Sequence, residues 1–276
     1  MNGAGNDFVI FDAKKQEISL PADQIRAISA RDNPVTKGCD QLLILRRSDK
    51  ADVFMQIYNA DGSEVDACGN ATRCIADMLY KELGRLPVTI ETNAAVLQGV
   101  KQQDDYILVD MGAPKFDWQD IPLAMPIEEA AKEVMDFVNI PELGAPTFVS
   151  MGNPHVVFFL NELPSNSEVT KIGSQIENST EIFPERVNVS FAVIQGKPNK
   201  MIIKSKVWER GAGLTQACGT GACAILTAAN KANNEINNIT VLFENSDQWV
   251  SVKMENKHIL LGGRIETEFS GAVEIE

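Results

Sequence analysis

The motif Ala67-Cys68-Gly69-Asn70 recurs in this chain as Ala217-Cys218-Gly219-Thr220, and the fold prediction starts from this repetition. The offset between the two copies is 150 residues, from residue 68 to residue 218. Three more landmarks keep nearly this offset, from 147 (residue 5 to residue 152) to 151 (residue 106 to residue 257): Gly5–Phe11 with Gly152–Phe158, Gln41 with Asn188, and Tyr106–Gly112 with Lys257–Gly263. Such agreement indicates an internal repeat. We predict two homologous halves, at about residues 1–112 and 145–263.

Each half is predicted to hold one helix, which begins directly after its cysteine. Apolar residues follow at helical spacing: Ala71, Cys74, Ile75, Met78, Leu79 and Leu83 in the first half, and Ala222, Ile225, Ala228, Ala229 and Ala232 in the second. Gly84 supplies a stop signal for the first helix. Short strand-like runs surround both helices, and the small alanines let strands approach closely. The predicted fold class is therefore α/β (α+β), with two pseudo-symmetric halves, each a mainly antiparallel sheet around a central helix.

Two segments stand outside the repeat. Residues 113–144 carry four prolines and read as a linker region with a short helix at Glu128–Val138. Residues 264–276 alternate like a strand and have no counterpart in the first half, so we expect them to pair with it. The predicted domains are therefore residues 1–112 plus 264–276, and residues 113–263.

The start of the first half is short. The second half opens on an extended run, Thr147–Ser150, whereas few residues precede the equivalent point in the first half. We expect either a strand upstream of Met1 or another segment in that place of the sheet. If an edge strand is absent, an upstream extension should raise thermal stability.

Composition limits the class of protein. The chain has 276 residues, and 38 Asp and Glu against 25 Lys and Arg leave a net charge of −13. Phosphate backbones and anionic lipids would repel it, so nucleic-acid and membrane partners are not expected. No apolar run reaches the ~18 residues of a membrane span. The first residues do not resemble a signal peptide, and five cysteines suit a reducing, cytoplasmic setting.

The expected chemistry lies at Cys68 and Cys218. Unpaired amides and the helix dipole at a helix start favour negative charge, so we expect both thiols to ionise below the usual pKa of about 8.5. The glycine after each cysteine permits close approach of a carboxylate. One thiolate could remove a proton from one face of a carbon while the other thiol supplies one to the opposite face. Such two-base inversion needs no cofactor.

The other cysteines are interpreted as structural. Cys74 and Cys223 fall inside the helices and suit the core, and Cys39 is given no role. Their spacings lack a C-x-x-C motif, and His155 and His258 are the only histidines, so no metal site is predicted. His258 is expected on a solvated turn.

Longer motifs carry a family resemblance. Residues Asn59–Cys74 and Glu209–Cys223 resemble the two active-site signatures of diaminopimelate epimerases. Further matches follow the family's order and spacing: Gly3–Phe8, Asp40–Leu43, Met151–His155 and Glu185–Asn188. The resemblance spans essentially the whole chain. It implies a site in the cleft between two similar halves and the interconversion of LL- and meso-diaminopimelate without pyridoxal phosphate, in lysine and peptidoglycan precursor synthesis.

The resemblance also implies roles for individual residues. Cys68 and Cys218 would be the two acid/base groups, assisted by His155 and Glu209. The backbone amides of four residues would hold the reacting α-carboxylate: Gly69, Asn70, Gly219 and Thr220. Six side chains would recognise the polar ends of the substrate: Asn6, Gln41, Asn59, Asn153, Asn188 and Arg210. Arg210 suits the distal carboxylate, which a guanidinium can bind through two hydrogen bonds.

Some alternatives stay open. Leu214 stands where many family members carry an acidic residue, which leaves that position without its usual group. A proline or hydroxyproline racemase would use the same two thiols, and a non-catalytic amino-acid-binding relative or a redox or metal protein would use neither for inversion. The partner expected from the sequence is one small molecule, and association into a homodimer stays open.

Overall fold

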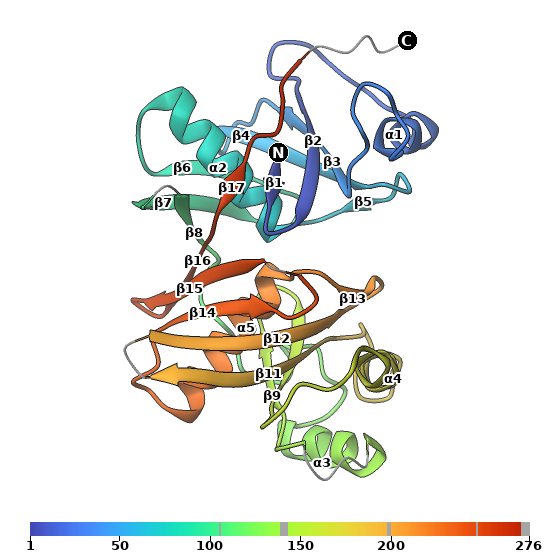
Figure 1. Cartoon of the computed structure of the whole chain (residues 1–276), viewed down its shortest axis with the longest axis vertical. Helices are drawn as coiled ribbons and strands as arrows, with labels where there is room; N and C mark the ends of the chain where they lie inside the picture. The colour runs from blue at the N-terminus through green and yellow to red at the C-terminus, as the bar shows by residue number, and fades with distance from the viewer. Residues whose placement is uncertain (105, 139–142, 198–199, 247, 272–276) are drawn as a thin grey trace. The chain divides into compact units, whose positions relative to one another are not determined.

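The chain divides into two units, Met1–Asp110 with Gly262–Glu276, and Met111–Leu261. Their secondary structure comes from a computed structural model that describes residues 1–104, 106–138, 143–197, 200–246 and 248–271. Figure 1 labels most elements of both units. Each unit is described by itself.

The first unit is a sheet around one long helix. Its elements are β1 (Asn2–Gly3), β2 (Asn6–Asp12), α1 (Ala22–Ser29), β3 (Gln41–Arg46), β4 (Val53–Asn59), β5 (Glu64–Val65), α2 (Gly69–Leu83), β6 (Val88–Glu91), β7 (Val96–Gln103), β8 (Tyr106–Asp110) and β17 (Ile265–Glu266). Strand β2 pairs parallel with β3, and β4 pairs antiparallel with β3 and β5. Strand β6 runs parallel to β4, and β7 is antiparallel to β6 and β8.

The second unit repeats this pairing. Its elements are α3 (Ile127–Val138), β9 (Thr147–Ser150), β10 (Pro154–Phe159), α4 (Asn166–Glu177), β11 (Asn188–Lys197), β12 (Lys200–Glu209), β13 (Gly213–Thr215), α5 (Gly219–Ala232), β14 (Asn238–Phe243), β15 (Trp249–Glu255) and β16 (His258–Gly262). Strand β10 is parallel to β11, and β12 is antiparallel to β11 and β13 but parallel to β14. Strand β15 closes the series against β14. The predicted α/β (α+β) fold is confirmed, with two similar halves whose strand pairs are mainly antiparallel.

The helices after the two cysteines are the cores of their units. Helix α5 contacts β9, β10, β11, β14 and β15 (Figure 1). Its small residues Ala222, Ala224 and Ala228 are buried. Helix α2 contacts β6, β7 and β8. It ends at Gly84, whose φ of +65° is left-handed, as the sequence predicts. Two residues of the predicted apolar faces depart from the prediction: Leu83 of α2 is 41% exposed, and Ala232 of α5 is exposed as well.

The short first strand has a neighbour on each side. Strand β1 pairs antiparallel with β2, and β17 pairs antiparallel with β1 through Gly3 and Ile265. The expected return of the tail to the first half is therefore confirmed at Ile265–Glu266, while residues 272–276 of that segment lie outside the described residues. In the second unit, Lys115 forms an isolated bridge to Ser150 of β9.

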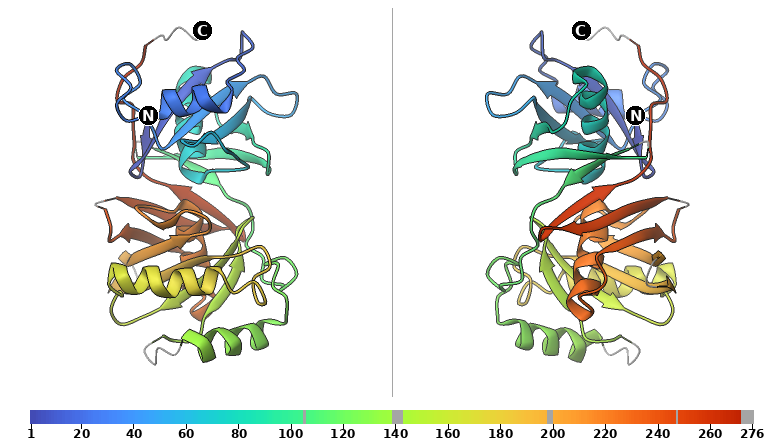
Figure 2. Two further views of the ribbon diagram at one scale, coloured as in Figure 1. Left: turned by 90° about the vertical axis from the view of Figure 1, so that its right-hand side faces the viewer. Right: turned by 90° about the vertical axis from the view of Figure 1, so that its left-hand side faces the viewer.

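Helices α3 and α4 cover the second unit from outside its sheet (Figure 2). Their apolar faces join one core cluster with β10 and β11, which includes Val134, Val169, Ile172 and Phe191. Helix α3 lies at Ile127–Val138, one residue longer than the predicted Glu128–Val138. Within the described ranges, no helix has the length and apolar character needed to span a bilayer.

Candidate functional site

Three polar side chains of the first unit gather at one sheet edge. Asn6 begins β2, Gln41 begins β3, and Asn59 ends β4. Register fixes this placement, because Gln41 lies opposite Phe8 on one side and Asn59 on the other. Helix α2 starts a few residues after the β4–β5 hairpin, so its N-cap, Cys68, follows Asn59 closely in the chain. We call Asn6, Gln41, Asn59, Cys68, Gly69 and Asn70 the first half-site.

The amides of this edge form a short chain. Gln41 Nε2 donates to Asn59 Oδ1 over 3.1 Å, and Asn59 Nδ2 donates to Ser63 Oγ over 3.1 Å. The oxygens Gln41 Oε1 and Asn6 Oδ1 are buried and have no hydrogen-bond partner in the described part of the chain. A buried acceptor without a donor is costly, so both oxygens suit a ligand that brings N–H groups, such as an ammonium.

Cys68 is the N-cap of α2. Its backbone is extended, with φ −146° and ψ 114°, and its carbonyl accepts from the Thr72 N–H at 2.9 Å. The side-chain amide of Asn6 donates to Cys68 Sγ over 3.8 Å. Gly69 and Asn70 are the first two helical residues, whose N–H groups have no partner inside a helix. The helix start predicted from the sequence is confirmed, and the arrangement offers an anion two backbone donors beside a thiol.

Asn70 turns its side chain inward. It is 4% exposed, and its Oδ1 accepts from Arg73 Nη2 at 2.9 Å. Arg73 itself is completely buried. The Asn70 side chain is therefore fixed against α2, which agrees with the expectation that its backbone amide, rather than its side chain, contacts a ligand.

An ionic clamp that sequence reasoning missed fixes the starts of β2 and β3. Arg31 donates to Asp7 through its two terminal nitrogens, Nη1 and Nη2, and Nη2 also donates to Asp40. Asp40 N–H donates to Asp7 Oδ1 at 2.8 Å, and Asp7 N–H donates to Asp40 Oδ2 at 3.1 Å. The neighbours of these two aspartates in the chain are Asn6 and Gln41. Arg31 lies in a loop without a motif, so no pattern in the sequence indicates this contact.

Cys218 occupies the corresponding place in the second unit, as the N-cap of α5. Its sulfur accepts from the Gly221 N–H at 3.3 Å and lies 3.6 Å from Thr220 Oγ1. The residue is 3% exposed, whereas Cys68 is half-buried. Gly219 and Thr220 supply the first two helical amides here. We call Asn153, His155, Asn188, Glu209, Arg210, Cys218, Gly219 and Thr220 the second half-site.

The electrostatics of Cys218 correct the sequence prediction. Burial raises the pKa of this thiol well above its usual range, and the negative charge of Glu209 raises it further. The hydrogen bonds from Thr220 and Gly221 act in the opposite direction and do not compensate. The expected lowering of the pKa by the helix start is therefore wrong for Cys218, because loss of water outweighs the partial charge of the helix end.

Glu209, the last residue of β12, is the hydrogen-bond partner of Cys218. Thr215 Oγ1 donates to Glu209 Oε1 at 2.5 Å. Burial raises the pKa of the Glu209 carboxyl, while hydrogen bonds from Thr215 and Cys218 lower it in part. A thiol that donates to a carboxylate can pass its proton along the same line, so the pair can hold one proton at either of two atoms.

His155 belongs to a hydrogen-bond chain that leads to Cys218. Its Nε2 lies 2.9 Å from Asn153 Oδ1, and Asn153 Nδ2 donates to Thr220 Oγ1 over 3.4 Å. Burial, with a smaller effect of the Arg210 charge, lowers the pKa of His155 to about 3. The imidazole is therefore neutral at physiological pH, and its buried Nδ1 has no hydrogen-bond partner among the described residues.

Asn188 connects β10 to the turn after β12. It lies opposite His155 in the parallel register, and its Nδ2 donates to the Pro154 carbonyl at 2.9 Å. Its Oδ1 accepts from the Arg210 N–H at 3.0 Å. The exposed Arg210 side chain donates to the Glu185 carbonyl at 2.9 Å. Both polar atoms of the Asn188 amide are thus engaged by backbone, which makes the side chain an organiser of the turn.

The structure brings the predicted residues together within each unit. Cys74 and Cys223 are fully buried core residues, as predicted, and burial raises the pKa of Cys74 to about 12. His258 is exposed, although it begins β16 instead of lying on a turn. Leu214 packs partly buried against the core of the second unit. Within the described ranges, no three His, Cys, Asp or Glu side chains gather as metal ligands do.

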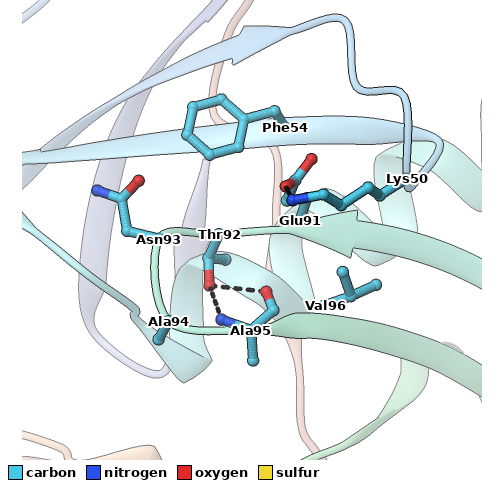
Figure 3. Close-up of a pocket in the computed structure, with 8 residues that line it drawn as sticks. All are labelled: Lys50, Phe54, Glu91, Thr92, Asn93, Ala94, Ala95 and Val96. Atoms are coloured by element: carbon cyan, nitrogen blue, oxygen red, sulfur yellow. Dashed lines mark hydrogen bonds and ion pairs between the residues drawn. The ribbon is translucent and has the colours of Figure 1, made fainter.

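A surface pocket of about 320 Å³ lies on the first unit, outside the half-site (Figure 3). It is lined by Lys50, Phe54 and residues 91–96, and none of the predicted site residues is among them. Its charges are satisfied internally, because Lys50 Nζ binds Glu91 Oε1 at 3.0 Å and Ser48 Oγ binds Glu91 Oε2 at 2.5 Å. The pocket therefore offers no convergent set of open polar groups.

Solved structures with low sequence identity share this fold. A PhzC/PhzF-type phenazine biosynthesis protein from Clostridium difficile matches with a TM-score of 0.64 at 12% identity, over 99% of this chain and 94% of its own. A hydroxyproline epimerase from Agrobacterium vitis matches with a TM-score of 0.56 at 12% identity, over 95% of this chain and 86% of its own. These likenesses concern the fold alone.

Sequence relatives are closer. A diaminopimelate epimerase from Acidiphilium cryptum is 39% identical over 274 residues, which cover 99% of this chain and 95% of that protein. One from Sphingopyxis alaskensis is 41% identical over 281 residues, covering 99% and 96%. The sequence profile described as diaminopimelate epimerase matches residues 1–116 and 147–267. This chain therefore belongs to the diaminopimelate epimerase family.

Proposed function

We propose that the protein is a cofactor-independent isomerase that interconverts LL- and meso-diaminopimelate, with Cys68 and Cys218 as its two acid/base groups. The two units correspond in this proposal to the epimerase-like domains, residues 1–112 with 264–276 and residues 113–263. The observation that carries it is that a cysteine caps the corresponding helix in both units of a family member.

Inversion of one α-carbon requires a base on one face and an acid on the other. In the proposed reaction, one thiolate removes the α-proton and the opposite thiol donates its own proton. After each turnover the first sulfur is therefore protonated and the second is deprotonated. The carbanion between these steps places charge on the α-carboxylate. The amides of Gly69, Asn70, Gly219 and Thr220 would stabilise that charge as helix-start donors.

The resting protonation state follows from the second half-site. Because the pKa of Cys218 is raised by burial and by Glu209, this thiol keeps its proton at neutral pH. We therefore assign Cys218 as the proton donor of the free enzyme and Cys68 as its base. Glu209 would take up or return the Cys218 proton, and neutral His155 would orient Asn153 and Thr220 beside the same sulfur.

The remaining residues would recognise the ends of the substrate. The buried oxygens of Asn6 and Gln41 suit ammonium donors, and Asn59 holds Gln41 at its strand end. In the second unit, Asn188 holds the backbone of Arg210. Arg210 would bind the distal carboxylate, which a proline-type substrate lacks. This difference favours diaminopimelate over the proline or hydroxyproline alternative.

The proposal places the enzyme in the cytoplasm, in the synthesis of lysine and of peptidoglycan precursors. Thiols rather than disulfides at all five cysteines fit that setting. Neither a second copy of the chain nor a cofactor is required by the proposed chemistry.

The first experiment is proton NMR of LL-diaminopimelate in D₂O with reduced protein. We expect loss of the α-proton signal and appearance of the meso isomer. Either Cys68→Ala or Cys218→Ala should reduce the rate by about 10²-fold to 10⁴-fold, since each removes one acid/base group. A matched control is Cys39→Ala, which removes a buried thiol outside both half-sites.

Three outcomes would contradict the proposal. Exchange with proline but not with diaminopimelate would favour the racemase alternative. Exchange that survives either cysteine substitution would exclude the two-thiol reaction. No exchange with either substrate by folded, reduced protein would favour a binding protein.

A further inference from the structure

We propose that Glu177 is a positioning residue for substrate recognition, because it holds the turn that carries Glu209 and Arg210. The inference rests on the proposed function. Glu177 is the last residue of α4 and precedes this turn by more than thirty positions in the sequence. No sequence motif of the site includes it.

Glu177 binds the chain on both sides of the Glu209–Arg210 pair. Its Oε2 accepts from Trp208 Nε1 at 2.7 Å, and its Oε1 accepts from the Gly211 N–H at 2.8 Å. Trp208 precedes the pair and Gly211 follows it. A single carboxylate therefore fixes the entry and the exit of the turn.

A third donor completes the set. Arg186 Nη1 donates to Glu177 Oε1 at 3.2 Å and forms an ion pair with it. Glu177 is 4% exposed, so these three donors take the place of its water. A carboxylate accepts on both oxygens and donates on neither, which an amide of the same size cannot reproduce.

The position of Glu177 in its own helix does not explain a negative charge. The C-terminal end of a helix carries a partial negative charge, and an anion there is unfavourable. Two of its donors also come from residues with left-handed backbone, Arg186 at φ +60° and Gly211 at φ +77°. That conformation is unfavourable for arginine, so the surrounding contacts must hold it. The buried carboxylate of Glu177 and the left-handed backbone of Arg186 and Gly211 are both accounted for if they hold the geometry of the Glu209–Arg210 turn.

Packing reinforces the same connection. The indole of Trp208 lies directly on Gly173 of α4, where a Cβ atom would come within 2.5 Å of Trp208 Cγ. At the far edge of the indole, a Cβ on Gly213 would lie 3.5 Å from Trp208 Cη2. The ring therefore contacts both α4 and the residue that opens β13, and its N–H is directed at Glu177.

The turn in question controls two functions of the second half-site. Glu209 is hydrogen-bonded to Thr215 and Cys218, and Arg210 is held by Asn188 through its backbone N–H. If Glu177 no longer fixes Trp208 and Gly211, both side chains change place together. Substrate recognition and the proton affinity of Cys218 should then change in one step.

The test compares Glu177→Gln with Glu168→Gln. Glu168 lies on the same helix, where it accepts from the Ser165 N–H at 2.7 Å in a capping box, so its loss weakens α4 without touching the turn. We expect Glu177→Gln to lower kcat/KM for LL-diaminopimelate by about tenfold to a hundredfold, mainly through KM. The alkaline limb of its pH profile should shift to lower pH, because displaced Glu209 no longer raises the pKa of Cys218. Glu168→Gln should lower the melting temperature and leave KM and the pH profile unchanged.

A second readout does not depend on activity. In ¹⁵N-labelled protein, the Gly211 amide should be shifted downfield and protected from exchange, and Glu177→Gln should abolish both features while Glu168→Gln retains them. Inactive wild-type protein would contradict the proposed function, whereas the Gly211 signal would still decide whether Glu177 holds the turn. Wild-type kinetics in Glu177→Gln, or an unchanged Gly211 signal, would overturn the inference.

Discussion

In the first unit the capping sulfur is approached by an amide, Asn6, and in the second by a carboxylate, Glu209. The backbone around them follows the same pairing of strands, and Asn59 and Glu209 end corresponding strands. A cation, Arg73, is buried beside the first helix start, where the second unit carries the uncharged Cys223. The repeated scaffold therefore places two equivalent thiols, while a few side chains give them different electrostatic surroundings.

Apart from the two cysteine substitutions, the largest effect on the rate should come from removing the charge that distinguishes the second half-site. Glu209→Gln is expected to lower the epimerisation rate by about 10²-fold, because the proton partner of Cys218 is lost. Steady-state kinetics with LL-diaminopimelate measure it. Glu162→Gln, which changes an exposed carboxylate of the same unit, should keep the wild-type rate. A wild-type rate in Glu209→Gln would show that the Glu209 carboxylate is not the proton partner that distinguishes Cys218 from Cys68.

The two thiols should also differ in reactivity. At pH 7.5, iodoacetamide should alkylate Cys68 at least about tenfold faster than Cys218, because Cys218 is 3% exposed and each unit of raised pKa removes tenfold of its thiolate. Mass spectrometry of timed digests gives both rates. In Glu209→Gln the rate at Cys218 should rise, since a negative neighbour that raises the pKa has been removed. Equal rates at the two cysteines in the wild type would refute the asymmetry.

His155 gives the second unit a dependence on acid that the first unit lacks at the equivalent position, Phe8. The pKa of His155 is lowered by burial to about 3 in the folded protein. Below about pH 6.5 the imidazole therefore binds a proton in the unfolded chain but not in the folded chain. The stabilising effect of neutral His155 is complete above pH 6.5 and declines as the pH falls. His155→Gln should therefore lose about 1.4 kcal/mol less stability than the wild type between pH 7.5 and pH 5.5.

Urea unfolding at the two pH values measures this difference. His258→Gln is the control for the loss of a histidine at an exposed position of the same unit. Parallel pH dependence in the wild type and His155→Gln would contradict the assignment of a buried, neutral imidazole.

The smallest effect concerns the residue three positions after each cysteine, Ala71 or Gly221. Ala71→Gly should destabilise the protein by about 0.5–1 kcal/mol through backbone entropy. A Cβ on Gly221 would lie 3.2 Å from Cys218 Sγ and 3.3 Å from Val207 Cγ2, so Gly221→Ala should gain little of the helix propensity of alanine. Thermal unfolding compares the two variants. A clear stability gain in Gly221→Ala would mean that the Cys218 sulfur has room to move.

The sequence predicted the parts of this arrangement that are local. The cysteines, their glycines and Gly84 are adjacent to the helix ends they determine, so the repeat and the helix starts were readable. The raised pKa of Cys218 could not be predicted from the sequence, because it depends on burial and on Glu209. The position at a helix start alone predicts a lowered pKa, which is the wrong direction. Glu177 and Arg31 act across distances in the chain that no short motif spans. Their roles depend on how α4 and the loop after α1 pack, which spacing along the sequence does not report.

The pairing of β17 with β1 affects the order in which the chain can mature on the ribosome. Residues 111–261 form a continuous stretch, so the second unit has all its strands once that stretch has emerged. The first unit includes residues from Gly262 onward, and β1, already next to β2 in the chain, obtains its second partner at Ile265 only after the second unit has been synthesised. Since domains generally fold as units during synthesis, the amino-terminal unit should be the last to be completed.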